Sequence, residues 1–172
     1  KTSVTDYNTS RKGGIIGISL DEGDELIRVE LTNGENDVVI GTYNGMAIRF
    51  NEKDVRATGR SSMGVIGMTL TDEDEVVSMQ LTSQGDYVLV ASEFGFGKLT
   101  DVNEFNTQHR GGKGVTCHNI TEKTGKLAAI VTVSDDDDIM LITNEGTIIR
   151  TNVSGINIYS RTASGVILMR LD

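Results

Sequence analysis

The chain has 172 residues, of which 37% are hydrophobic, and its 16 basic and 25 acidic residues give it a formal net charge of −9. No apolar run approaches the roughly 18 to 20 residues that a membrane-spanning helix needs. The polar segment Lys1–Ser10 does not resemble a signal peptide, and the single cysteine, Cys117, has no partner for an intrachain disulfide. These features predict a protein of the reducing cytoplasm that does not enter a membrane.

The negative charge is concentrated in a few places. Twelve of the 25 acidic residues, four in each cluster, lie in Asp21–Glu25, Asp72–Glu75 and Asp135–Asp138. These clusters lack the glycine and glutamate spacing of a calcium loop, so they are interpreted as solvated turns, with a loosely held cation as the alternative. A uniformly acidic protein would bind DNA poorly, because phosphate neutralisation needs concentrated Lys and Arg. The longest connecting segments are neutral to slightly positive, so net charge alone does not exclude nucleic acid.

A glycine followed by alternating apolar residues recurs at a nearly constant spacing. Gly14, Gly64, Gly114 and Gly165 are separated by 50, 50 and 51 positions. A fixed period of this length is typical of repeat proteins, in which each unit buries its apolar face against its neighbours. The chain is therefore interpreted as one partial domain, 1–172, with repeats at about 14–63, 64–113 and 114–164 and an extra strand at 165–171.

Each repeat is expected to contain four strands. In the second repeat they are Gly64–Leu70, Val76–Leu81, Tyr87–Ser92 and Phe96–Thr100, chosen by period-two alternation and by runs of β-forming residues. Asn44-Gly45 and its equivalents predict a type I′ hairpin turn between the last two strands. Only Lys123–Val133 approaches a helical pattern. The sequence predicts an all-β, β-propeller-like array of four-stranded antiparallel blades. Such an open array should have exposed sheet edges, which favour self-association.

The longest connections, 51–63, 101–113 and 152–164, have thirteen residues each and precede the strand glycines. Connections of this length in a compact β protein are usually functional. Each holds one apolar residue that is expected to anchor it: Val55, Phe105 and Ile156. Each also holds an arginine four residues before the strand glycine: Arg60, Arg110 and Arg161. A single such arginine is often only a solubilising residue, but three in register favour a shared function.

Metal binding and catalysis find little support. Cys117, His118 and His109 are the only soft ligands, and no second Cys/His pair completes a zinc site. His118 occupies the column of Ile18, Met68 and Met169 and is interpreted as a core or rim histidine. No nucleophile elbow or phosphate-binding P-loop is present. No catalytic residue, metal or cofactor is therefore expected in this chain.

The remaining candidate is a glycine-rich basic heptad in the second long connection. Its residues are Gln108, His109, Arg110, Gly111, Gly112, Lys113 and Gly114. Exposed amides beside Arg and Lys could form a phosphate cradle. The alternative is a glycine-rich turn with incidental charges, and chemistry alone leaves both interpretations open.

This heptad resembles the gyrase-A box, Gln-basic-Arg-Gly-Gly-basic-Gly, with His109 at the second position. The surrounding repeats are similar to those of the C-terminal domain of the DNA gyrase A subunit, notably in Gly45–Phe50, Gly146–Thr151 and Ser164–Leu168. The resemblance implies a β-pinwheel, in which neighbouring repeats exchange strands and the outer rim wraps double-stranded DNA. It further implies a non-catalytic part of a bacterial, chromosome-associated enzyme that introduces negative supercoils. The ATPase, the Mg²⁺ site and the cleavage tyrosine would lie elsewhere in the gyrase A and B subunits.

Two departures from that family are visible. Its ring usually has six blades, whereas this chain supplies about three repeats, and the box normally lies in the first blade. The similar domain of the topoisomerase IV A-type subunit is one alternative, and a protein-interaction propeller without a DNA role is another. DNA contact is predicted for the heptad, with Arg60 and Arg161 in the other long connections and Arg49 and Arg150 in support. The acidic turns should face away from the DNA.

Overall fold

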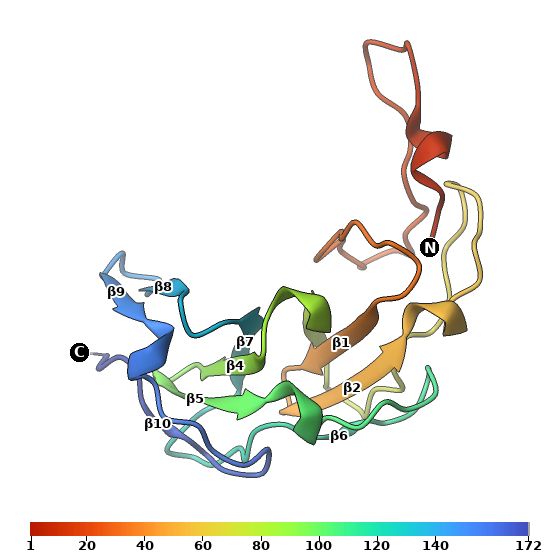
Figure 1. Ribbon diagram of the computed structural model, residues 1–172. Coiled ribbons are helices and arrows are strands. Elements are labelled where there is room, and N and C mark those ends of the chain that lie inside the picture. The colour runs from red at the N-terminus through yellow and green to blue at the C-terminus, as the bar shows by residue number, and fades with distance from the viewer. Residues whose placement is uncertain (172) are drawn as a thin grey trace.

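The computed structural model describes residues 1–171, and within them it contains strands and short 3-10 turns but no α-helix (Figure 1). The strands are β1 (Asp37–Thr42), β2 (Met46–Asn51), β3 (Val76–Leu81), β4 (Tyr87–Ser92), β5 (Phe96–Asp101), β6 (Val115–Thr116), β7 (Leu127–Val133), β8 (Asp138–Ile142), β9 (Ile148–Asn152) and β10 (Val166–Ile167). The 3-10 turns are Val4–Tyr7, Glu52–Asp54, Thr82–Gln84, Val102–Glu104 and Val153–Gly155. The all-β prediction is confirmed. No helix in the described part of the chain is long and apolar enough to cross a membrane.

The strands form two four-stranded sheets and one two-stranded sheet, all antiparallel. Their orders are β3-β1-β2-β6, β10-β5-β4-β7 and β8-β9. Each complete sheet combines a hairpin from one repeat, a strand from the next repeat and a two-residue strand from the repeat after that. Neighbouring repeats therefore exchange strands, as the resemblance implied. In Figure 1 the sheets follow an arc, with β6 and β10 along its lower edge.

Apolar side chains from adjacent sheets form the core between them. Val39, Val88, Val90, Leu127 and Ile130 are almost completely buried in one cluster that joins the first two sheets. Burying a side chain of this size contributes about 1.5 to 3 kcal/mol, so this cluster dominates the contact between the sheets. The buried residues of β1 and β4 do not alternate, because both faces of these strands are largely covered.

The hairpin turns differ from the predicted type. Three residues, Tyr43–Gly45, connect β1 to β2, and Gly45 N–H donates to the Thr42 carbonyl at 3.0 Å. Gly45 has a φ of +79°, whereas Asn44 has no positive φ. A type I′ turn needs positive φ at both central residues, so that prediction is wrong. The glycine alone takes the left-handed conformation in a three-residue turn.

The predicted first strand of each repeat is also largely wrong. Residues 13–20 and 64–70 are not strands, and their equivalents in the later repeats are the two-residue strands β6 and β10. Strand exchange explains the difference, because the first strand of a repeat pairs with a hairpin two repeats earlier. Within the described residues, 13–20 and 64–70 have no such hairpin to join. The segment with a weak helical pattern is the strand β7.

The β8-β9 sheet has exposed edges and faces. Met140 in β8 is 67% exposed, whereas the equivalent Val39 in β1 is fully buried. Ile148 in β9 is 59% exposed, whereas the equivalent Ala47 is fully buried. The sheet pairs with no other strand of residues 1–171. The prediction of exposed sheet edges is confirmed, and self-association stays a prediction.

Candidate nucleic-acid interface

The long connections 101–113 and 152–164 each cross from their own hairpin to the preceding sheet. After the 3-10 turn Val102–Glu104, the chain runs alongside β2, where Gln108 N–H donates to the Arg49 carbonyl at 2.7 Å. One repeat later, Tyr159 N–H donates to the Leu99 carbonyl of β5 at 2.8 Å. These contacts turn the connections into fixed outer-edge loops, called here the long loops.

The predicted apolar anchors occupy equivalent places. Val55, Phe105 and Ile156 each follow directly after a 3-10 turn and close it with a backbone hydrogen bond of 2.9 to 3.2 Å. Phe105 and Ile156 are buried and Val55 is half-buried. The prediction of equivalent anchors in the three repeats is confirmed.

The three arginines in register share one contact. The Nη1 atom of each donates to a backbone carbonyl two residues after the strand glycine that begins its own repeat: Arg60 to Ile16, Arg110 to Ile66 and Arg161 to Thr116. Each arginine therefore ties its long loop to the first segment of its own repeat. This shared structural contact explains why the three arginines occupy equivalent positions. It does so whether or not the remaining guanidinium nitrogens contact a ligand.

The heptad Gln108–Gly114 is a packed turn rather than an open cradle. Gly111 N–H donates to the Gly67 carbonyl at 2.8 Å, and Thr69 donates from N–H and Oγ1 to the Gly112 and Gly111 carbonyls at 2.9 and 2.7 Å. A Cβ on Gly114, which has a φ of +74°, would lie 2.3 Å from the Ala47 carbonyl oxygen. At least two of the glycines are thus used for packing.

Two basic side chains of the heptad remain at the surface. His109 is fully exposed, and its Nδ1 lies 3.7 Å from Asp54 Oδ2. Lys113 is exposed and makes no hydrogen bond or ion pair with another side chain of residues 1–171. The Gly111 amide is not available to a phosphate, so the heptad would bind one mainly through these side chains.

Arg49 and Arg150 occupy equivalent strand positions but have different surroundings. Arg49 Nε donates to Asp37 Oδ2 at 2.9 Å, and its Nη1 donates to the Val102 and Phe105 carbonyls at 3.1 and 3.3 Å. Its side chain is only 18% exposed, because it holds the base of the next long loop. Arg150 pairs with Asp138 and is 72% exposed. The geometry favours Arg150 over Arg49 as a supporting DNA contact.

The pKa of Asp37 reflects this internal role of Arg49. Burial alone would raise the pKa of the carboxyl group. Hydrogen bonds from Asn51 and Arg49, together with the Arg49 charge, outweigh burial and hold the pKa below its usual value. The pair is therefore charged at neutral pH and stabilises the hairpin.

The acidic clusters do not all lie at one end of the sheets. Asp74 Oδ1 accepts a hydrogen bond from Asn44 N–H at 2.8 Å, which places 72–75 at the hairpin tip. The Asp137 backbone carbonyl instead accepts from Val153 N–H at 2.9 Å, at the start of the third long loop. The cluster 135–138 lies beside the start of the third long loop because it connects β7 to β8 rather than preceding a β3-like strand. That the acidic turns face away from DNA stays a prediction.

A buried lysine that was not among the predicted site residues lies beneath the third long loop. Lys98 is fully buried in β5, where the equivalent residues are Ile48 and Ile149. Its Nζ donates to the Ser160 and Arg161 carbonyls, both at 2.6 Å. Burial lowers the pKa of Lys98 to about 8. A lysine in an otherwise apolar column was the sequence signal that could have revealed it.

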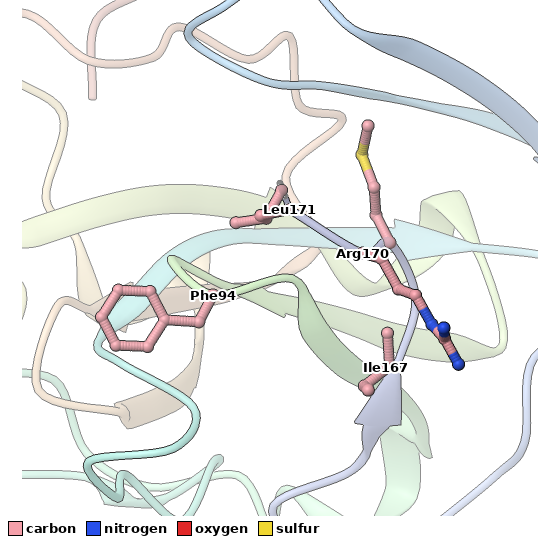
Figure 2. A pocket seen from close by; sticks show the side chains of 5 residues that line it. Phe94, Ile167, Arg170 and Leu171 are labelled. Carbon is pink, nitrogen blue, oxygen red and sulfur yellow. The ribbon is translucent and has the colours of Figure 1, made fainter.

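An open hollow beside β10 is a packing surface between repeats. It is lined by Phe94, Ile167, Met169, Arg170 and Leu171, and Figure 2 shows the Arg170 guanidinium directed away from the Phe94 ring. In the first sheet Ile120 packs beside Gly45 as Leu171 does beside Gly95, but there Lys126 Nζ also donates to Asn44 Oδ1, at the position equivalent to Phe94. The hollow therefore corresponds to a surface that later residues cover in the preceding repeat. The described residues contain no group of three side chains arranged to hold a metal ion.

The fold and the long loops define a propeller-type repeat protein with exchanged strands and one loop per sheet along an outer edge. The chain matches the family model described as the DNA gyrase C-terminal domain, beta-propeller, over residues 1–33, 36–83, 86–134 and 137–172. It belongs to this family.

Similar protein sequences and solved structures support this family assignment. The chain is 56% identical over 170 residues to the DNA gyrase A subunit of Clostridium acetobutylicum, a match that covers 99% of this chain and 20% of that protein. The chain thus spans about a fifth of the length of the curated relatives it matches. Among solved structures, the C-terminal domain of DNA topoisomerase IV superimposes with a TM-score of 0.92 at 30% identity, over 98% of this chain and 53% of that chain. The DNA gyrase A C-terminal domain gives a TM-score of 0.86 at 30% identity, over 94% and 55%.

Proposed function

We propose that this chain is a non-catalytic DNA-wrapping module of a type IIA topoisomerase of the gyrase A class. One observation carries the proposal: in a chain of the gyrase C-terminal family, the long loops recur every 50 or 51 positions, and two of them, one with the basic heptad 108–114, run along β2 and β5 of the preceding sheets. A curved row of phosphate contacts suits a bent duplex. Such contacts are tolerant of sequence, and any preference follows from the deformability of the DNA.

The wider setting of this proposal is the bacterial cytoplasm. There the module would act with the rest of gyrase A and with gyrase B, which would supply the ATP- and Mg²⁺-dependent steps of negative supercoiling. The TM-score of 0.92 with the topoisomerase IV domain supports the A-type subunit of that enzyme as a second candidate. An acidic pI of about 4.7 is the observation that favours a protein-interaction propeller instead.

Mobility-shift titrations with double-stranded DNA at several salt concentrations test the proposal. Lys113→Gln should weaken binding about equally for unrelated sequences and reduce the log–log salt slope by roughly 0.9, the value for one lost phosphate contact. Lys123→Gln, which removes the same charge from the exposed turn 121–125 beside the β4-β5 hairpin tip, is the matched control.

Arg110 needs a separate design, because its Nη1 also ties the loop to Ile66. Arg110→Gln should weaken DNA binding and also loosen the loop, so thermal unfolding should be recorded alongside to separate the lost charge from the loosened loop. Salt-independent binding, or no binding by the parent chain at low salt, would overturn the proposed function.

A further inference from the structure

Two acidic side chains lie at equivalent places beside the long loops. Asp54 and Glu104 are each the last residue of the 3-10 turn that follows a hairpin, and they are 50 positions apart. The equivalent residue of the third repeat is Gly155. Neither acid belongs to the three acidic clusters, so their positions need a separate explanation.

Both carboxylates contact the same part of the next long loop. Glu104 Oε2 accepts a hydrogen bond from Arg161 N–H at 2.8 Å. Asp54 Oδ2 lies 3.7 Å from His109 Nδ1, and the Asp54 carbonyl accepts from Arg110 Nε at 3.3 Å. His109 and Arg110 are the equivalents of Ser160 and Arg161. In two successive repeats, an acidic residue therefore lies beside hydrogen-bond donors at, or next to, the equivalent arginines Arg110 and Arg161.

The Arg161 amide has the chemistry of an anion site. The peptide that carries this N–H has the Ser160 carbonyl at its other end, and that carbonyl accepts from the buried Lys98 ammonium at 2.6 Å. A cation at the carbonyl polarises the peptide and strengthens the amide as a donor. Backbone amides and basic side chains are the groups that bind DNA phosphates. A carboxylate oxygen and a phosphate oxygen would compete for such a donor.

We propose that the Asp54 and Glu104 carboxylates occupy two phosphate-binding positions of the outer edge, and that the DNA backbone binds there by displacing them. This inference rests on the proposed function. It makes each acid a built-in competitor that weakens DNA contact at its own loop. It also explains why acidic residues lie against the basic loops of a DNA-binding surface.

The charge of each acid can be removed while its hydrogen-bond acceptor is retained. In the chain that carries Asp54→Asn and Glu104→Gln together, the amide oxygens can still accept from the loop, so a purely structural role would be preserved. The matched control is Asp72→Asn with Glu122→Gln, which also removes one aspartate and one glutamate charge. Both residues are exposed and lie in turns that do not contact the long loops. Thermal unfolding of all variants checks that the fold is unchanged.

Mobility-shift titrations at several salt concentrations should show a roughly three- to tenfold gain in DNA affinity for the Asp54→Asn/Glu104→Gln chain, since a modest exposed-charge effect is removed at each of two sites. The salt slope should steepen by up to about 0.9 for each additional phosphate that the protein neutralises. The control pair should change affinity less than twofold. Equal affinities of the two double variants, with salt-dependent binding by the parent, would overturn the inference alone. Absence of binding by the parent would overturn the proposed function and the inference together.

A measurement without DNA tests the anion site directly. Titration with dimethyl phosphate should shift the Arg161 amide resonance in Glu104→Gln more than in the parent chain. In the Lys98→Met/Glu104→Gln chain the shift should be smaller, because the peptide is no longer polarised. A shift of the same size in all three chains would contradict the proposed site.

Discussion

At the residue scale, His118 is a buried imidazole without a hydrogen-bond partner for either ring nitrogen among the described residues. Burial and, to a lesser extent, the Lys98 charge lower the pKa of His118 to about 4. The unfolded chain takes up a proton near pH 6.5, whereas the folded chain does so only near pH 4. Folding therefore loses stability as the pH falls through this window.

Replacing His118 by Met, the residue at the equivalent positions 68 and 169, should remove that acid sensitivity. The free energy of unfolding of the parent should fall by up to about 3 kcal/mol more than that of His118→Met between pH 6.5 and 4. Urea denaturation at a series of pH values measures the difference. His109→Gln is the control, since His109 is fully exposed. Parallel pH profiles for parent and His118→Met would disprove the assignment.

The buried Lys98 is expected to make the folding stability depend on pH in the alkaline range. Its folded pKa of about 8 lies below the ordinary 10.5, so between these values the unfolded chain holds more protons and stability rises with pH. Lys98→Met should abolish this rise, which is at most about 3 kcal/mol. It should also lower hydrogen-exchange protection in 157–161, because the Ser160 and Arg161 carbonyls lose their donor. Unchanged protection would mean that Lys98 does not hold the loop.

At the scale of single elements, the strand glycines have a backbone role that composition alone does not show. Gly114→Ala should destabilise the chain by several kcal/mol, since the added Cβ would lie 2.3 Å from the Ala47 carbonyl and the φ of +74° disfavours any side chain. Gly59→Ala is the matched control, because nothing lies within 4 Å of its Cβ position. Chemical denaturation distinguishes them, and equal stabilities would contradict the packing described for β2 and β6.

The sequence predicted some elements well and others poorly for a definite reason. The hairpins β1-β2, β4-β5 and β8-β9 are local, so alternation and a turn glycine suffice to locate them. The first strand of each repeat depends on a hairpin two repeats away, and a sequence pattern does not reveal that partner. The equivalent positions of three arginines in the repeats identified Arg60, Arg110 and Arg161, but did not reveal their contacts with backbone carbonyls. Asp54 and Glu104 were missed because acids were judged by clustering rather than by position in the repeat.

At the scale of the whole molecule, the exposed β8-β9 sheet predicts concentration-dependent association. Its backbone groups and apolar residues such as Met140 and Ile142 are available to another chain. Light scattering over a hundredfold concentration range should show a rising mass for the parent chain. Met140→Lys, which places a charge on this face, should reduce it. A constant monomer mass for the parent would show that the exposed sheet edges do not mediate self-association.

Strand exchange also determines when each sheet can be completed while the chain is synthesised on the ribosome. The β1-β2 hairpin is complete at residue 51, but its outer partner begins at Val115, 64 positions later. At about 5 to 20 residues per second, the hairpin waits on the order of several seconds for that partner. Each sheet is finished only when parts of two later repeats have emerged, so a pause in translation within one repeat leaves the two preceding sheets open. The chain must be made at a steady pace to fold without exposing those edges.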